Sequence, residues 1–332
     1  MMTIFTVSLI CGFCFGFAAQ RGSLCVVSGI ADVIDRRSVR VFVSFFRISL
    51  WVALLTLPLC WLYTAAHRMM TYSPSLSTIV GGFLFGIGAA VNGGCSFGTL
   101  MRFAAGDLSF IASFAGMAAG ICSQRRMSML SAPMPNGLSV VAHPSRFSIL
   151  VLSLVALFSI RELVLLPQRK GAGSWSPEQA AVAIGLCGGV IYVLNGPWFY
   201  TIAFDHLTDI TGADQLHGFE LAAIIFAILA GAVISATSNQ MFHLRFQWRR
   251  LPLHIIGGAA MGFGAALIPG GNAVLVLNAF PALSPHAAPA YLSLILGAGI
   301  ALFASRFLRS AAQFHTAFPS PSPHRTPAAH WP

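Results

Sequence analysis

The chain has 332 residues, of which 56% are hydrophobic and only 8% are charged. Soluble domains carry about 25% charged residues, so the composition excludes an ordinary soluble domain and indicates a protein that lies within a membrane. The formal net charge of +10 does not indicate nucleic-acid binding, because most Lys and Arg residues lie between apolar stretches, where the cytoplasmic loops of membrane proteins concentrate them.

Apolar stretches follow one another along the chain, and a helix of about 20 such residues crosses the hydrocarbon core of a bilayer. We therefore predict an all-α, polytopic membrane protein. The N-terminal stretch lacks the basic residues that precede the core of a signal peptide, so we expect it to be a membrane segment. The stretches are residues 4–19, 39–63, 109–121, 147–166, 180–194, 219–237, 253–268 and 288–307.

Two polar segments interrupt this pattern. Residues 123–146 are rich in Pro, Ser and Arg and separate two apolar halves. The residues after 310 are rich in Pro and Ser, which is typical of disorder. We therefore predict a first membrane half over 1–122, a polar linker over 123–146, a second membrane half over 147–310 and a disordered tail over 311–332.

Four segments share a Gly-x-x-x-Gly pattern followed by a break in the apolar run. Counting nine residues on from the second glycine reaches Cys25, Cys95, Trp198 and Gly271. A single Gly-x-x-x-Gly is weak evidence, since small residues commonly let membrane helices touch, but the shared offset indicates an internal repeat. The segments begin GFCFGFAAQRGSLC at Gly12, GFLFGIGAAVNGGC at Gly82, GLCGGVIYVLNGPW at Gly185 and GAAMGFGAALIPGG at Gly258.

The breaks themselves predict an anion site. Gly and Pro interrupt the intrahelical hydrogen bonds, and free backbone groups are tolerated at membrane depth only inside protein or beside a water-filled cavity. An apolar segment resumes after each break, which predicts four re-entrant half-helices whose N-termini meet at the membrane centre. Helix N-termini carry partial positive charge and unpaired N–H groups, so their meeting point suits an anion.

The charges of the loops predict that the two halves are inverted repeats. The loop after the first repeat, residues 35–40, is basic, whereas the loop after the third, residues 209–220, is acidic. Residues 67–77 are nearly neutral, whereas the corresponding residues 243–250 are strongly basic. The positive-inside rule then places corresponding loops on opposite sides of the membrane. Inverted repeats are a common transporter plan, with the substrate site near the bilayer midplane.

Cys25 and Cys95 hold equivalent places in the first two repeats and are the strongest candidates for contact with a substrate. A Cys at a helix N-terminus tends to ionise and offers a polarizable S–H donor, and both properties suit an anion that contains sulfur. Arg102 lies on roughly the same helix face as Cys95, where it either attracts the anion or extends to the membrane boundary. The asparagines at the breaks either cap the half-helices or contact the anion.

We predict no catalytic residue, metal site or cofactor. The predicted substrate path consists of Cys25, Cys95, Gly22, Asn92, Gly94, Ser96, Asn195, Gly270, Gly271, Asn272 and Arg102.

The segments RGSLC and NGGCSFG, within their glycine-rich halves, resemble the YeeE/YedE family of bacterial inner-membrane proteins. The resemblance covers most of residues 1–307. It implies a pinched hourglass of helices with short half-helices at the waist, and uptake of thiosulfate. It also implies that Cys25 and Cys95 pass the anion along by S–H hydrogen bonds, without a lasting covalent bond. Family members often work beside a small cytosolic sulfur-carrier protein, which the resemblance implies as a partner here.

The last repeat departs from the family pattern. Members that carry thiosulfate have a third cysteine there, and this chain reads Pro269-Gly270-Gly271-Asn272. Two alternatives follow. Either the backbone N–H groups of Gly271 and Asn272 replace the missing contact, or the substrate is a different anion.

The function that we predict is a permease, not an enzyme, for thiosulfate or a related small sulfur-containing anion in the bacterial inner membrane. One alternative is a membrane sulfurtransferase with a cysteine nucleophile. It requires an activating base, and neither Cys25 nor Cys95 has a His or a carboxylate beside it in the sequence. The other alternative is a non-transporting subunit of a membrane complex, in which the glycines serve helix packing only.

Overall fold

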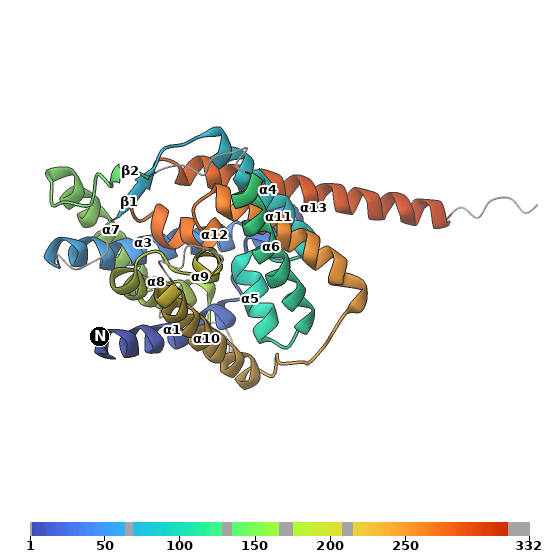
Figure 1. Cartoon of the computed structure of the whole chain (residues 1–332), viewed down its shortest axis with the longest axis horizontal. Coiled ribbons are helices and arrows are strands. Elements are labelled where there is room, and N and C mark those ends of the chain that lie inside the picture. The colour runs from blue at the N-terminus through green and yellow to red at the C-terminus, as the bar shows by residue number, and fades with distance from the viewer. Residues whose placement is uncertain (1, 64–68, 128–134, 166–174, 208–214, 318–332) are drawn as a thin grey trace, which may run out of the picture.

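The computed structural model describes residues 2–63, 69–127, 135–165, 175–207 and 215–317, and these are almost entirely helical (Figure 1). The first half of the chain forms α1 (Met2–Gly22), α2 (Val26–Arg36), α3 (Arg40–Leu62), β1 (Met70–Tyr72), α4 (Leu76–Asn92), α5 (Ser96–Ala104), η1 (Leu108–Phe110), α6 (Ile111–Met127) and β2 (Pro135–Leu138). The second half forms α7 (Arg146–Leu165), α8 (Pro177–Asn195), α9 (Tyr200–Leu207), α10 (Gln215–Ser238), η3 (Trp248–Arg250), α11 (Leu251–Leu267), α12 (Gly271–Val274), η4 (Leu275–Ala279) and α13 (Ala287–Ala317).

Among the described residues, seven helical segments are long and apolar enough to cross a membrane, and the bent pair Trp248–Leu267 and Gly271–Ala279 would make an eighth. The prediction of an all-α, polytopic membrane protein is therefore confirmed. Two details differ from the sequence analysis. The stretch at 109–121 falls largely in α6, which at 17 residues is not among these segments. In contrast, the segment Leu76–Ala104, which the sequence analysis treated only as a repeat, is long enough to cross.

The predicted linker and tail are partly ordered. β2 lies within the linker and pairs antiparallel with β1, and α6 and α7 occupy its two ends. At the other end of the chain, α13 continues to Ala317 and so extends past the boundary at residue 310. The rest of the predicted tail, residues 318–332, lies outside the described residues.

Each of the four predicted breaks ends a long helix and is followed by a short one. The short helices α2, α5, α9 and α12 begin at Val26, Ser96, Tyr200 and Gly271. Cys25 and Cys95 are the N-cap residues of α2 and α5. Gly93, which caps α4, and Gly270, which caps α12, have φ of 78° and 87°, a left-handed conformation that glycine adopts without strain. The third short helix starts two residues later than the shared offset of the repeats predicts.

The repeated glycines let helices approach until their backbones touch. A Cβ at Gly16 would lie 1.9 Å from the Ile228 carbonyl oxygen of α10, and one at Gly86 would lie 2.1 Å from the Leu294 carbonyl oxygen of α13. Gly262 approaches α6 in the same way, and Gly189 lies in van der Waals contact with α3. Close approach without side chains is how small residues stabilise helix contacts in membranes.

Replacing Gly262 with Leu should destabilise the fold strongly. The new Cβ would lie 2.0 Å from the Met117 carbonyl oxygen, and overpacking of this kind costs about 3 kcal/mol at the upper end of its usual range. The measurement is thermal unfolding of the purified protein in detergent. Gly299→Leu is the matched control, because no atom of the described residues lies within 4 Å of a Cβ there. Equal melting temperatures for the two variants would contradict the close approach of α11 and α6.

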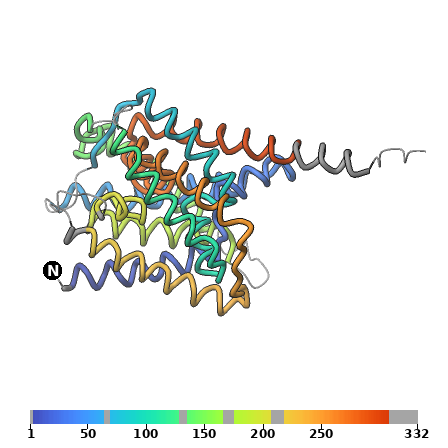
Figure 2. Tube along the Cα trace, turned by 45° about the vertical axis from the view of Figure 1, so that its right-hand side comes forward, coloured from blue at the N-terminus to red at the C-terminus, as the bar shows by residue number. Residues whose placement is uncertain are grey.

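The two ends of the molecule differ in charge. Arg21 at the end of α1 bonds to Asn239 just after α10, and Asp107 just after α5 pairs with Arg245. Asp35 near the end of α2 pairs with Arg306 of α13. The C-terminal ends of α1, α2, α5 and α10 therefore lie at one end of the molecule, together with the far part of α13. In Figure 1 this end lies to the right, whereas the N-terminus and the strands lie to the left. The tube in Figure 2 shows the same separation from a second direction. We call the ends the strand face, marked by β1 and β2, and the basic face, marked by Arg36, Arg37, Arg40, Arg245, Arg249, Arg250 and Arg306.

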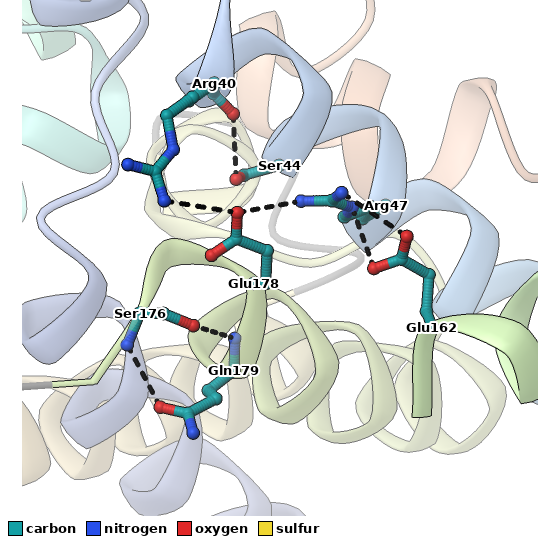
Figure 3. A network of polar contacts seen from close by, with 7 residues as sticks. All are labelled: Arg40, Ser44, Arg47, Glu162, Ser176, Glu178 and Gln179. Atoms are coloured by element: carbon teal, nitrogen blue, oxygen red, sulfur yellow. Dashed lines mark hydrogen bonds and ion pairs between the residues drawn. The ribbon is translucent and has the colours of Figure 1, made fainter. Parts of the chain in front are cut away.

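A buried ionic network ties α3, α7 and α8 together near the basic face (Figure 3). The Arg47 side chain is 10% exposed and lies between two carboxylates, 3.1 Å from Glu162 Oε2 and 3.2 Å from Glu178 Oε1. The exposed Arg40 side chain lies 3.7 Å from the same Glu178 oxygen. Arg47 is therefore a structural cation, which explains a charge inside an apolar segment.

Candidate functional site

The two cysteines that lead the predicted path face each other at the starts of α2 and α5. Their Sγ atoms are 3.6 Å apart, and the Val26 backbone N–H lies 3.4 Å from Cys95 Sγ. Cys95 is fully buried, and Cys25 is 8% exposed. Gly98, one turn into α5, makes room for this pair, because a Cβ there would lie 2.6 Å from Cys25 Sγ.

Direct contacts also join the starts of the other two short helices to this pair. Ser96 Oγ donates to Asn272 Oδ1 at 2.8 Å, which connects α5 with α12. The Tyr200 hydroxyl donates to the Ser96 carbonyl at 3.2 Å, and Thr201 Oγ1 donates to the Gly270 carbonyl at 2.8 Å. The start of each of the four short helices thus contacts the start of a short helix from another repeat.

Asn272 has a donor to spare at this junction. The residue is fully buried, and its Oδ1 accepts from Ser96. Its Nδ2 has no hydrogen-bond partner among the described residues. A buried amide without a partner costs about 1–3 kcal/mol, so the group is poised to donate to a ligand that reaches this layer.

A cavity of about 350 Å³ lies on the basic-face side of the cysteines. Cys25, Ser28 and Gly98 line its deep end, and Arg102, His243 and Arg245 line it nearer the basic face. Arg245 is paired with Asp107. The Arg102 guanidinium lies 5.8 Å from the centre of the Phe110 ring, and none of the described carboxylates pairs with it. Arg102 therefore leaves a positive charge in the cavity that Cys25 adjoins.

A second cavity, of about 490 Å³, lies on the strand-face side of the junction. Its wall includes Asn195, Pro197, Thr201, Pro269 and Gly270. Cys95 contacts Cys25 of the first cavity, and Ser96 bonds to Asn272, which lies two residues after Gly270 of the second. Cys95, Ser96 and Asn272 are all fully buried. The two cavities are therefore separated by one closed layer, which is made of the starts of the short helices.

Some predicted path residues make extensive contacts within the fold. Asn92 is buried and fully bonded: its amide donates to Gly94 and Thr99, and its oxygen accepts from Ser113 and lies 2.8 Å from His254 Nδ1. Gly22 packs against α8, where a Cβ would lie 2.5 Å from Ala180 Cβ.

Neither Asn92, Gly22 nor Gly94 lines either cavity. Asn195 does line the strand-face cavity, but its amide is bonded to Ser8 and Ile191. For Asn92, the structure therefore supports a structural role over contact with an anion.

Gly271 is the residue that the shared offset reaches in the last repeat, within the stretch where the family resemblance implies a third cysteine in other members. Its φ is 73°, and a Cβ there would lie 3.0 Å from the Phe85 ring. Its N–H donates to the Ile268 carbonyl at 3.0 Å. The Gly271 amide is therefore occupied, and a side chain at this position would be strained.

Sequence reasoning missed three residues at the junction: Gly98, Tyr200 and Thr201. Tyr200 and Thr201 begin the third short helix, where the repeat offset led only to Trp198. Their position at a helix start was the available signal. Their partners, Ser96 and Gly270, lie in other repeats and could not be read from local pattern.

Comparison with known proteins relates the chain to sulfur transport. The profile of a family described as sulphur transport matches residues 21–300. The thiosulfate transporter TsuA of Escherichia coli (strain K12) is 26% identical over 313 residues, which cover 81% of this chain and 86% of that protein. The thiosulfate transporter TsuA of Spirochaeta thermophila is 33% identical over 116 residues, which cover 33% of this chain and 34% of that protein.

Proposed function

The chain belongs to the sulphur transport family, and from that premise we propose that it is a permease that takes up thiosulfate through the layer formed by Cys25, Cys95 and the starts of the short helices. It is a multi-pass membrane protein of a transporter family, not an enzyme. The sulfurtransferase alternative is therefore set aside. The observation that carries the proposal is the contact between the two thiols, 3.6 Å apart and on the boundary of a cationic cavity.

The spacing of the thiols supports transfer of an anion from one to the other. An S–H group is a weak, polarizable donor, so its hydrogen bond to thiosulfate is easily exchanged. With sulfur atoms 3.6 Å apart, the anion can bond to the second thiol before it leaves the first. No bond to sulfur is made or broken in this step, and the thiols stay reduced.

The side chain of Asn272 is our candidate for the contact that the third cysteine supplies in other members. The Gly271 amide already donates to Ile268, which argues against the backbone alternative at that residue. Asn272 Nδ2 is buried without a partner and belongs to the same layer as Ser96. An amide N–H is a stronger donor than a thiol, so this substitution keeps thiosulfate as the substrate.

We also propose that the two membrane halves are inverted repeats. The support is the equivalent packing of the four Gly-x-x-x-Gly pairs. The pair in α1 rests on α10, which follows the counterpart helix α8, and the pair in α8 rests on α3, which follows α1. The pairs in α4 and α11 repeat the arrangement with α13 and α6. Exchange of this kind is expected when two halves are related by a two-fold axis in the membrane plane.

The charge of the two faces supports a direction for the path. The positive-inside rule assigns the basic face to the cytoplasm, and we place the protein in the bacterial inner membrane. Thiosulfate would then pass from the strand-face cavity to Asn272, Cys95 and Cys25, and leave past Arg102. The small sulfur-carrier protein that the family resemblance implies would receive the anion at the basic face.

Growth on thiosulfate as the sole sulfur source tests the proposal, in a bacterium without its own sulfate and thiosulfate importers. The wild-type chain should restore growth. Asn272→Leu, which removes one donor to an anion, should lower the uptake rate about tenfold, since such a bond contributes about 1.5–3 kcal/mol. Growth with another sulfur anion but not with thiosulfate would assign a different cargo. No growth on any sulfur anion, with the protein well expressed, would favour the non-transporting subunit.

A further inference from the structure

A third cavity lies beside the strand-face cavity and has no part in the path described so far. Its volume is about 370 Å³, and its wall includes Tyr192, Asn278 and His286. It shares Tyr72, Pro197, Ile202 and Pro269 with the strand-face cavity. Pro269 directly precedes Gly270, which bonds to Thr201 in the closed layer. The cavity therefore adjoins the outer side of the proposed path, and we call it the side cavity.

Two side chains in the wall of the side cavity carry buried polar atoms without partners. Asn278 is 7% exposed, and neither its Nδ2 nor its Oδ1 has a hydrogen-bond partner among the described residues. His286 is 1% exposed, and its Nε2 likewise has no partner there. Buried polar groups are nearly always bonded in folded proteins, so two such residues in one wall need an explanation. A ligand that accepts hydrogen bonds supplies one.

The bonds around His286 determine which ring nitrogen carries the proton. Ser284 Oγ accepts the Tyr72 backbone N–H at 3.0 Å and lies 2.8 Å from His286 Nδ1. The Ser284 hydroxyl has its own proton to give, and Nδ1 is the acceptor within reach. We assign the Ser284 proton to this bond, which makes Nδ1 the acceptor and places the proton of the neutral ring on Nε2. The unpartnered Nε2–H is a donor.

The ring of His286 is also neutral. Burial lowers the pKa of the His286 side chain to about 4, so it carries no charge at neutral pH. None of the described residues that line the side cavity is Asp, Glu, Lys or Arg. The side cavity thus offers two neutral donors, Asn278 Nδ2 and His286 Nε2, whereas the basic-face cavity offers the charge of Arg102.

We propose that the side cavity is an outer binding station for the sulfur oxyanion, in which Asn278 and His286 donate hydrogen bonds to its oxygens before it moves to the closed layer. The inference rests on the proposed function and names a second site for the same substrate. Neutral donors suit such a station, because a transport site must bind strongly enough to admit the ion and weakly enough to release it. The cation at Arg102 then favours onward movement to the basic face.

The test uses the full chain in proteoliposomes, with thiosulfate as the probe and initial uptake rates over a range of concentrations. His286→Phe and Asn278→Leu should each raise the KM at least tenfold, the loss of one hydrogen bond to a charged group of about 1.5–3 kcal/mol, and leave the maximal rate within about twofold. His286→Gln keeps an N–H donor and should restore most of the affinity.

Leu283→Ala is the control, because Leu283 is an exposed neighbour of Ser284 that does not line the side cavity. An unchanged KM in His286→Phe and Asn278→Leu would overturn the station while leaving the proposed function intact. A fall in maximal rate and in the amount of folded protein, with KM unchanged, would overturn it too, since that assigns both residues a structural role. Absence of uptake by the wild type would instead refute the proposed function. In that case, thermal shift of the purified wild type by thiosulfate, unchanged in the two variants, would overturn the station on its own.

Discussion

Cys95→Ala should lower thiosulfate uptake at least tenfold, because it removes one of the two thiols between which the anion is transferred. Cys95 Sγ lies 3.6 Å from Cys25 Sγ, and the residue is fully buried, so no water can replace the thiol. A hydrogen bond to a charged group contributes about 1.5–3 kcal/mol, which corresponds to roughly 10- to 100-fold. Alanine removes the donor with little change in volume. The measurement is initial uptake of radiolabelled thiosulfate into proteoliposomes. Cys25→Ala should lower the uptake rate by a similar factor.

The control is Cys122→Ala in α6. Cys122 is a free cysteine that lines neither of the two cavities beside the layer, so uptake should stay within about twofold of the wild type. Mass spectrometry of the protein after exposure to thiosulfate should find both path thiols unmodified. Full activity in Cys95→Ala would mean that the anion does not pass between the two thiols. A stable persulfide on either cysteine would mean that the sulfur is transferred covalently.

Arg47→Ala should have the largest effect on stability. The substitution removes the cation that lies between Glu162 and Glu178 and leaves two carboxylates in a buried, low-dielectric place. Breaking a buried ionic network from one side costs about 3–5 kcal/mol. We expect a large fall in the thermal unfolding temperature in detergent, and little protein that elutes as a single species.

Arg40→Ala is the matched variant, because Arg40 shares the Glu178 oxygen but its side chain is 69% exposed. Exposed ion pairs contribute about 0–1 kcal/mol, so its unfolding temperature should stay close to that of the wild type. Arg47→Lys keeps the charge but not the fork that reaches both carboxylates, and should fall between the two. If Arg47→Ala and Arg40→Ala unfold at the same temperature, the buried network contributes no more to stability than an exposed ion pair does.

The positions of the breaks could be predicted from sequence because they depend on local chemistry. Clusters such as Asn-Gly-Gly and Pro-Gly-Gly mark turns, and the apolar run that follows begins a new helix, so Cys25 and Cys95 could be identified as helix starts. The third break was predicted less well. Phe199 has a φ of 133°, and the Trp198 indole donates to Gly188, so the backbone stays irregular until Tyr200. These interactions depend on neighbours and are not visible in the repeat.

The choice between a packing role and a site role could not be predicted from sequence for the asparagines. Asn92 and Asn272 stand at similar breaks, but Ser113 and His254 use the oxygen of Asn92, whereas Asn272 keeps its amide nitrogen unbonded. Those partners come from α6 and α11, far along the chain. The strand in the linker also depends on a partner that is remote in the chain, since β2 exists only because β1 lies beside it.

By itself, the sequence determined the membrane class, the four breaks and the two cysteines at helix starts, because composition and backbone propensity act over a few residues. Only the tertiary structure decided that the two thiols are in contact, that Asn272 has a donor to spare and that His286 and Asn278 share a cavity. Each of these facts depends on distances between residues that are remote in the chain. Such distances follow from how glycine-lined helices pack, and no local pattern encodes them.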